Sequence, residues 1–583
     1  MSSKVVFIGL TALKEFWKDD DSLVFLGEWC KTNLEKKDKF MNQEVLEFAW
    51  DNMTKMEHGY EFSTKIYLEI MPIIQNFLNG YHSTNKSQRY WELIIGNWLL
   101  TFIEAIYERL ETLNILIAKY QKFETYVLSE TDYITPLEYE DFVFNVIDDE
   151  YNMQIYSQIL KYKGFDFPTK KHPLRQKKDF SKKGRPIRKY IMKLLNIFSY
   201  DSKLTVTSPY FSNGFSSYLK LFFNSKGKVV FNEFDETFQF PISIDKDKRE
   251  LFEDLKSEND FINLLFNLFK VNFPALFLEG YTEFDNFVKK QNFSVTKNYL
   301  TSTGLHTNYI YKFWLANNLE KINLFCIQHG GGYCIDSFNT PEFYEKRVVD
   351  SFFSWGKKEG NYLTHEKISQ ECKPKKSGRI LYCTTVYPKY MFRFQNSYNS
   401  TAIPKIYIPM ILSFFKSIQN TDDILLRGYP NEYDYKVVAT IKKNFDNLKI
   451  DNHKKSFHER LRESKLFVCD HMQTTYLETL SMNFPTVVYV NQSCYSFKDM
   501  DVINLLVDAN ILFFNEKDAA IHINNITDNI SYWWNSEKVQ KAREEFCYNY
   551  AKTSDNWAKD WIVTPENIID SDLMNNKGKI QDL

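Results

Sequence analysis

Two stretches of the sequence place polar residues directly after a short apolar run of the kind that forms a buried strand. The first is Gln328-His329-Gly330-Gly331-Gly332, which follows Ile322–Ile327. Consecutive glycines let backbone N–H groups approach a ligand closely, and a histidine can donate, accept or take up a proton. The turn is neither GxGxxG nor a Walker loop, so it does not indicate a dinucleotide or ATP. We expect it to take part in chemistry or ligand binding, the alternative being a histidine that only satisfies backbone groups.

The second stretch follows the apolar run Leu466–Cys469 and begins at Asp470. Thr474 and Thr475 offer hydroxyls and backbone N–H groups at the expected start of a helix, which suits a phosphate. Glu478 lies one turn further on, within reach of a ribose hydroxyl. The structural alternative is that Thr474 or Thr475 only caps the helix and that Glu478 is its capping-box partner.

Two further turns have the same form. Glu28 follows the expected strand Ser22–Leu26, and Arg427 follows the expected strand Asp423–Leu426. In open α/β sheets, ligands bind outside the carboxyl ends of the strands, so both side chains are candidates for a site. For Glu28 the alternative is a plain turn in which Trp29 packs into the core.

The elements that must position these turns alternate between expected strands and helices along most of the chain. A length of 583 residues indicates two or three domains. We predict an α/β fold with two Rossmann-like domains. The predicted ranges are an N-terminal α/β domain over 1–356, a linker over 357–376, a C-terminal α/β domain over 377–568 and a loose tail over 569–583.

Residues 43–122 carry apolar side chains at helical spacing with few breakers, which predicts a helical insertion in the N-terminal domain. Within it, His82, Arg89 and Trp98 are candidates for an acceptor groove. The alternative is that they pack the insertion onto a sheet.

Composition narrows the class of protein. The net charge is −2 and the pI is about 6.6, which does not indicate a nucleic-acid partner. Eight scattered cysteines without a CxxC pair argue against a zinc site and a disulfide framework. The first residues lack a signal-peptide layout, and the longest apolar stretch, Leu93–Ile103, is too short and too polar to span a bilayer. We therefore expect a cytoplasmic protein.

Residues 170–189 form a basic run with ten Lys or Arg. It is either a solvated loop or a contact with an anionic partner such as the inner membrane face. The acidic runs Asp19–Asp21 and Asp148–Glu150 are interpreted as solvated or capping residues, and no DxD lies in a convincing loop. We expect no essential metal and no cofactor.

Six motifs in this order resemble a family of transferases found in bacterial O-antigen and related surface-polysaccharide clusters. They are FLGEWC (25–30), RYWELIIGNWLL (89–100), QHGGGY (328–333), EFYEKRVVDSFFSWG (342–356), LRGYP (426–430) and CDHMQTTYLETLSMNFPTV (469–487). The resemblance covers about residues 5–560. It implies a GT-B-like glycosyltransferase whose C-terminal part is similar to capsule transferases that use CMP-Kdo and to CDP-glycerol-type polymer transferases.

Carried over from that resemblance, Arg427 would meet the donor phosphate or sugar carboxylate, Thr474 and Thr475 would meet phosphate, and Glu478 would meet ribose. The remaining donor-side candidates are Gln328, Gly330, Gly331 and Asp470. The first turn reads Arg427-Gly428-Tyr429-Pro430 where the related enzymes have His-Pro, which leaves the class of donor open.

The predicted function is transfer of a sugar from a nucleotide-activated donor, with a CMP-activated acidic sugar favoured, to a glycan or lipid-linked glycan of a surface polysaccharide or O-antigen. Glu28 is the first candidate for the general base that such a reaction needs, and His329 is the second, or orients the acceptor. The alternatives are transfer of a polyol phosphate from a CDP-glycerol-type donor, and a non-catalytic module that binds a glycan or nucleotide.

Overall fold

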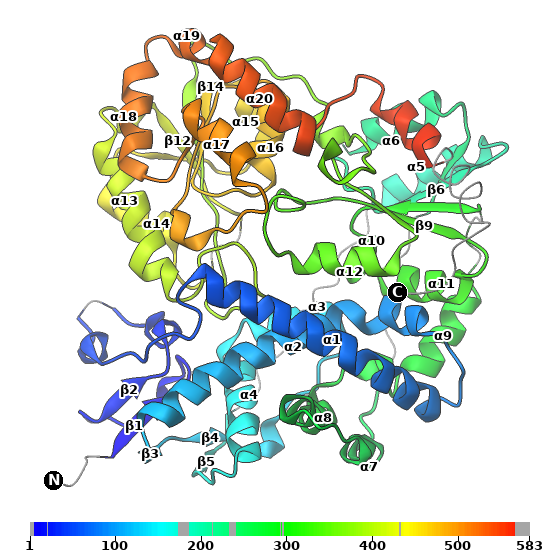
Figure 1. Ribbon diagram of the computed structural model, residues 1–583, viewed down its shortest axis with the longest axis vertical. Coiled ribbons are helices and arrows are strands. Elements are labelled where there is room, and N and C mark those ends of the chain that lie inside the picture. The colour runs from blue at the N-terminus through cyan, green and yellow to red at the C-terminus, as the bar shows by residue number, and fades with distance from the viewer. Residues whose placement is uncertain are drawn as a thin grey trace.

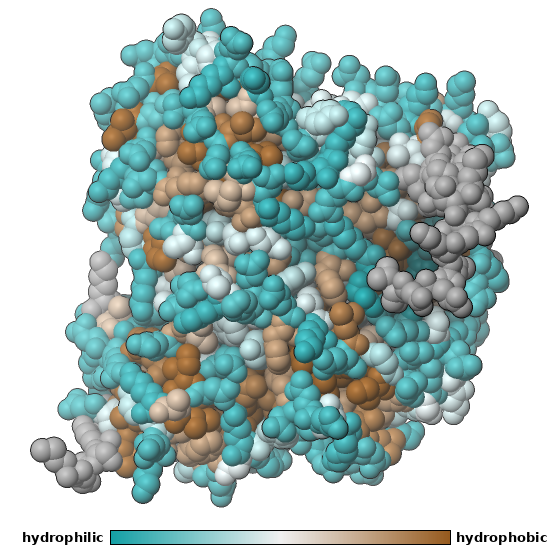
Figure 2. Space-filling view, viewed as in Figure 1, coloured by the Kyte–Doolittle hydropathy of each residue, from teal (hydrophilic) through white to brown (hydrophobic). Residues whose placement is uncertain are grey.

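The computed structural model describes residues 5–19, 21–35, 37–172, 186–212, 214–232, 241–291, 293, 296–430 and 433–565. Most of the basic run 170–189 and the whole predicted tail 569–583 lie outside these residues. Within them we find no helical segment that combines the length and the apolar character needed to cross a membrane. The face shown in Figure 2 is predominantly hydrophilic, with scattered hydrophobic side chains.

The C-terminal α/β domain, at the upper left of Figure 1, is built on a six-stranded parallel sheet with the order β13-β12-β11-β14-β15-β16. Its strands are β11 (Arg379–Cys383), β12 (Ile424–Arg427), β13 (Lys449–Ile450), β14 (Ser464–Cys469), β15 (Thr486–Tyr489) and β16 (Leu512–Phe513). Its larger helices are α13 (Ile408–Ser417), α14 (Val437–Asn444), α16 (Thr474–Ser481), α17 (Met500–Asp508), α18 (Glu516–Ile526) and α20 (Glu537–Tyr550). The strands are short apolar runs because both faces of the sheet are covered, as in other parallel sheets.

A second parallel sheet, at the upper right of Figure 1, has the order β10-β9-β8-β6-β7. Its strands are β6 (Leu204–Thr207), β7 (Val229–Phe231), β8 (Asn298–Thr301), β9 (Asn323–Ile327) and β10 (Ser351–Phe353). Helices that pack with it include α5 (Pro186–Ile197), α6 (Phe215–Asn224), α10 (Gly304–Thr307), α11 (Tyr309–Asn318) and α12 (Thr340–Val348). The prediction of two Rossmann-like domains is therefore confirmed.

The expected strand Ser22–Leu26 does not belong to this second sheet. β1 (Val6–Gly9) lies between β2 (Leu23–Phe25) and β3 (Phe123–Glu124) in a separate three-stranded sheet. The strands that occupy the centre of the second sheet are instead β6 and β8, with the sequences LTVT and NYLT. Their threonine and asparagine residues interrupt the apolar pattern, which is why the sequence analysis missed both strands.

The predicted helical insertion is confirmed as α1 (Met53–Tyr81) and α2 (Gln88–Lys119), which lie between β2 and β3 in the chain. In Figure 1 they cross the lower half of the molecule, beneath both large sheets. Residues 90–106 of α2 are buried on every face, including the polar side chains of Glu92, Asn97, Thr101 and Glu104.

The two α/β domains meet where the carboxyl ends of their sheets face each other. A Cβ atom on Gly331, after β9, would lie only 2.5 Å from the backbone carbonyl of Gln473, after β14. The segment predicted as a linker is packed rather than loose, with Thr364, His365 and Glu366 buried. The helical residues 557–565 return to the first domain, where the indole N–H of Trp561 donates to the carbonyl of Thr364 at 2.9 Å.

Candidate functional site

The turn after β9 is held in place by its own glutamine. The Gln328 amide oxygen accepts from the backbone N–H of Trp355 at 2.9 Å, and its Nε2 donates to the carbonyl of Gly330 at 2.8 Å. The Gln328 side chain is buried, so it fixes the shape of the turn rather than presenting a polar group to a ligand. Gly331 is needed for the close approach of the second domain, since any side chain there would meet the Gln473–Thr474 backbone.

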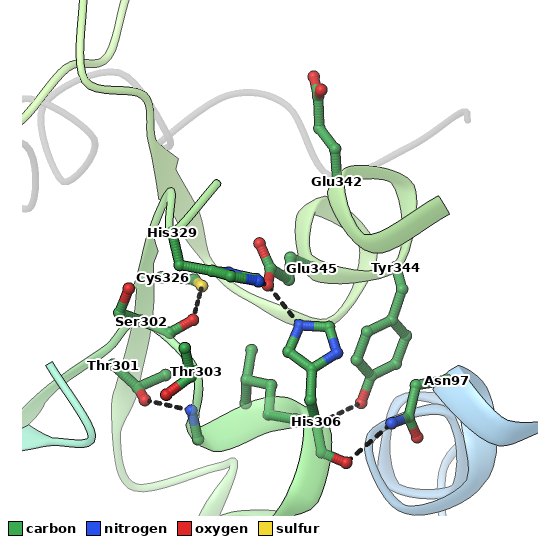
Figure 3. A network of polar contacts seen from close by, with 12 residues as sticks. Asn97, Thr301, Ser302, Thr303, His306, Cys326, His329, Glu342, Tyr344 and Glu345 are labelled. Carbon is green, nitrogen blue, oxygen red and sulfur yellow. Dashed lines mark hydrogen bonds and ion pairs between the residues drawn. The ribbon is translucent and has the colours of Figure 1, made fainter. Parts of the chain in front are cut away.

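His329 projects from this turn toward a buried carboxylate that the sequence analysis did not single out. Its Nδ1 lies 3.2 Å from Oε1 of Glu345 on α12, and His306 Nε2 lies 2.6 Å from the same oxygen (Figure 3). The Tyr333 hydroxyl lies 3.1 Å from Nδ1 and 3.4 Å from Nε2 of His329. Glu345 is fully buried, whereas the side chains of His329 and His306 are 22% and 15% exposed.

The electrostatics of this group favour an ionised carboxylate. Burial alone would raise the pKa of Glu345, but the charge of His329 and hydrogen bonds from both imidazoles outweigh it and lower the pKa to about 2. Burial lowers the pKa of His306. When Nδ1 of a neutral His329 donates to Glu345, the lone pair lies on Nε2. This is the arrangement of a histidine general base that is oriented by a carboxylate.

The same three side chains are one of two groups among the described residues that could hold a metal ion, the other being Cys334, Glu342 and Glu359. One ligand atom from each of His306, His329 and Glu345 lies within 4.8 Å of the others. Both imidazoles face Oε1 of Glu345, while its Oε2 is buried and has no hydrogen-bond partner among the described residues. The absence of an essential metal stays a prediction from the sequence.

On the other side of the domain junction, α16 begins at Thr474. Its N-cap is Gln473, which makes no side-chain cap hydrogen bond, so the capping-box alternative for this helix is wrong. The capping box nearby belongs to Ser456 and Glu459 on the preceding helix. The Thr475 hydroxyl is buried and lacks a hydrogen-bond partner among the described residues. The first N–H groups of a helix have no partner within the helix and are of the kind that bind phosphate.

Glu478, one turn into α16, faces the first domain. Its Oε2 lies 3.0 Å from Nε2 of His458, and its Oε1 lies 3.8 Å from Nζ of Lys367. Lys367 belongs to the segment that was predicted as the linker. Glu478 therefore lies at the domain junction, where a ribose could reach it if Lys367 moved aside.

Two of the predicted donor-side residues have internal partners instead. Asp470 is fully buried and accepts hydrogen bonds from the hydroxyls of Tyr382 at 2.7 Å and Tyr407 at 3.0 Å. Arg427 lies at the end of β12 as expected, but its guanidinium forms an ion pair with Asp451. Arg460 also pairs with Asp451, at 2.8 Å.

Glu28 is placed away from the His329 turn. It follows β2 of the small N-terminal sheet and pairs with Lys405 of the C-terminal domain at 3.1 Å. Glu28 and His329 therefore belong to different sheets and have different partners.

The three candidates for an acceptor groove adopt the packing alternative. Trp98 has no exposed surface. His82 stacks on Tyr281, its Nε2 lies 3.0 Å from the carbonyl of Phe277, and burial lowers its pKa to about 4. Arg89 pairs with Asp350 at 2.8 Å.

Comparison with known proteins identifies the family. A model of the LIC12162 family of transferases matches residues 6–564, nearly the whole chain. The chain belongs to this family. The prediction of a transferase is thereby confirmed, while the link to O-antigen clusters and to capsule transferases stays a prediction. No curated protein matches the chain.

Several solved structures of glycosyltransferases are similar to parts of this LIC12162 family member. MurG from Acinetobacter baumannii shares 10% identity over 62% of this chain and 99% of its own, with a TM-score of 0.31. The trehalose 6-phosphate synthase from Burkholderia multivorans shares 11% identity over 64% of this chain and 99% of its own, with a TM-score of 0.34. WaaG, described as a glycosyltransferase involved in lipopolysaccharide biosynthesis, shares 11% identity over 62% of this chain and 99% of its own, with a TM-score of 0.28. Likenesses at this level carry no functional conclusion for this chain.

Proposed function

We propose that this protein transfers a sugar from a nucleotide-activated donor to a glycan or lipid-linked glycan acceptor. The observation that supports this most is the contact of Gly331 with Gln473 and Thr474. It brings a histidine with a buried carboxylate partner next to the free N-terminus of α16. Glycosyl transfer needs both parts, a base for the acceptor hydroxyl and stabilisation of the leaving phosphate.

In the proposed reaction, Nε2 of His329 takes the proton of the acceptor hydroxyl as its oxygen attacks the anomeric carbon. The bond between that carbon and the donor phosphate oxygen breaks, and the nucleotide leaves with the bonding electrons. The α16 N–H groups and the hydroxyls of Thr474 and Thr475 stabilise its charge. Glu345 keeps the imidazole oriented and stabilises its protonated form. His329 is favoured over Glu28 because only His329 has a buried orienting carboxylate and lies at the junction.

The finer features of the proposal rest on sequence. A CMP-activated acidic sugar as donor, and a surface polysaccharide or O-antigen as acceptor, follow from the motif resemblance. The basic composition of residues 170–189 supports peripheral contact with the inner membrane face from the cytoplasmic side.

Thermal unfolding with CMP, CDP, UDP, GDP or ADP added separately tests the donor. A ligand that binds only the folded state stabilises it by RT ln(1 + [L]/Kd), about 2.7 kcal/mol at a hundredfold excess over Kd. Stabilisation by CMP alone would support a CMP-activated acidic sugar, and stabilisation by UDP or GDP would retain the transferase with another donor. Release of CMP from CDP-glycerol with transfer of the polyol phosphate would favour the alternative enzyme. Stabilisation by none of them would favour a glycan-binding module.

A further inference from the structure

Lys367 occupies an unusual place for a residue of a predicted linker. It lies on a short 3-10 helix (Glu366–Ile368), and its side chain is only 12% exposed. The ammonium group lies 3.8 Å from Glu478 Oε1 and 3.6 Å from the centre of the Tyr210 ring. One lysine of the first domain is thus directed at the helix whose N-terminus is the candidate phosphate site.

Buried side chains on the N-terminal side of Lys367 fix its backbone. His365 has no exposed surface, and its Nε2 lies 2.9 Å from the carbonyl of Pro209. Glu366 accepts from the Ser212 backbone N–H at 2.9 Å and from the Ser217 hydroxyl at 2.9 Å. Such buried polar anchoring is not needed for a spacer between domains. It is consistent with a segment whose purpose is to hold one side chain in position.

The loop beneath Lys367 is held in an unfavourable backbone conformation. Ser208 and Tyr210 have φ angles of 45° and 61°, a region that residues other than glycine rarely adopt and that costs about 1–3 kcal/mol each. The Ser208 carbonyl accepts from the backbone N–H groups of Ser302 and Thr303 at 3.2 Å, which holds the loop. The Tyr210 ring then meets the His329 ring edge to face, with centroids 6.2 Å apart. Tyr210 thus contacts both Lys367 and the candidate base.

We propose that Lys367 is an anion-binding residue that takes the phosphate of the donor next to the anomeric carbon. In the ligand-free protein Glu478 is its counterion. The side chains of Lys367 and Glu478 are only 12% and 6% exposed, so the ammonium group needs an anionic partner, and a phosphate can replace the carboxylate that lies 3.8 Å away. Glu478 keeps His458 at 3.0 Å as a second partner and becomes available to a ribose. This inference rests on the proposed function and assigns a further residue to the same site.

Isothermal titration of wild type and Lys367→Met with inorganic pyrophosphate, and with each nucleotide and its nucleoside, tests the assignment. Loss of a charge-assisted contact should weaken pyrophosphate and nucleotide binding by roughly tenfold to a hundredfold. The affinity for the nucleoside should change by less than about twofold, since the nucleoside has no phosphate for Lys367 to contact. Lys358→Met is the matched control, because Lys358 also pairs across the domains, with Asp499 at 2.5 Å, but at the start of α17.

The variant Glu478→Gln provides a second test. Its expected effects on ligand binding would not occur if the ion pair between Lys367 and Glu478 were purely structural. Removing the carboxylate frees Lys367, so pyrophosphate binding should tighten while nucleotide binding weakens through loss of the ribose contact. If wild type binds a nucleotide and Lys367→Met, folded by its thermal transition, binds it equally well, the role of Lys367 is overturned and the proposed function stands. If wild type binds neither pyrophosphate nor any nucleotide, the proposed function fails and this inference fails with it.

Discussion

Glu345 and Asp470 are both fully buried carboxylates near the carboxyl ends of a parallel sheet, yet their surroundings shift their pKa values in opposite directions. Burial raises the pKa of Asp470 to about 7, since its partners are neutral hydroxyls whose hydrogen bonds offset the burial only in part. For Glu345 the charge of His329 and two imidazole hydrogen bonds overcome the burial and lower the pKa to about 2. The partners of a buried carboxylate therefore decide whether it is charged at neutral pH.

This difference separates a supporting residue from one that can assist chemistry. A carboxylate that is ionised at neutral pH can orient an imidazole and stabilise its protonated form. The Asp470 carboxyl instead joins β14 to Tyr382 of β11 and to Tyr407 at the end of a short helix. In the sequence Asp470 directly follows a strand whereas Glu345 lies within a helix, and only the structure shows which partners each one has.

The largest expected effect is on turnover. Glu345→Gln removes the charge that orients His329 and should lower kcat by about a hundredfold or more, within the range of general base catalysis. Asp470→Asn should lower kcat by less than about tenfold, because it changes only hydrogen bonds behind the site. Steady-state rates of nucleotide release measure both. A larger loss in Asp470→Asn than in Glu345→Gln would contradict the contrast between the two residues.

The next largest effect is expected from a substitution at the contact between the two domains. Gly331→Ala places a methyl group against the backbone of Gln473 and Thr474, which cannot move aside as a side chain can. We expect destabilisation of about 1–3 kcal/mol or partial separation of the domains, with loss of turnover. Gly80→Ala in α1 is the matched control, since a Cβ there meets no atom within 4 Å and alanine favours the helix by up to about 1 kcal/mol. Denaturant unfolding and kcat measure both variants. Equal stability and equal kcat of Gly331→Ala and Gly80→Ala would contradict the importance of the contact between the domains.

The pH dependence of stability should show the two carboxylates with opposite sign. The raised pKa of Asp470 gives stability that is present below the unfolded value of 3.8 and is lost as the pH rises through about 7. The lowered pKa of Glu345 gives stability that is present above 4.5 and is lost as the pH falls toward 2. Asp470→Asn should therefore flatten the free energy of unfolding between about pH 4 and 7, and Glu345→Gln below about pH 4.5. The measurement is the free energy of unfolding as a function of pH. If its slope in a variant equals that of the wild type in the stated pH range, the pKa shift of the substituted residue is contradicted.

The sequence predicted the features that depend on local pattern. Apolar runs indicated β2, β9, β12 and β14, and helical spacing indicated α1 and α2. Strands with polar residues, β6 and β8, could not be recognised, because their burial is set by the sheet around them. The sequence also could not show that His306, Glu345 and His329 come together, since α10, α12 and the turn after β9 meet only in the folded chain.

Lys367 was missed for a related reason. Residues 357–376 are charged and contain a proline, which is typical of a linker, and local pattern does not reveal that His365 and Glu366 find buried partners in distant loops. For Glu28 the error was to predict a site residue where the structure does not place one at the domain junction. Its position after a strand was recognised correctly, but the strand belongs to another sheet.

The most direct test of the central claim compares turnover in His329→Ala and Glu28→Gln with a donor that binds the wild type. If His329 oriented by Glu345 is the general base, His329→Ala should lose about a hundredfold or more in kcat, whereas Glu28→Gln should stay within about threefold of wild type. Turnover that survives in His329→Ala but is abolished in Glu28→Gln would contradict the account and return the base to the N-terminal sheet.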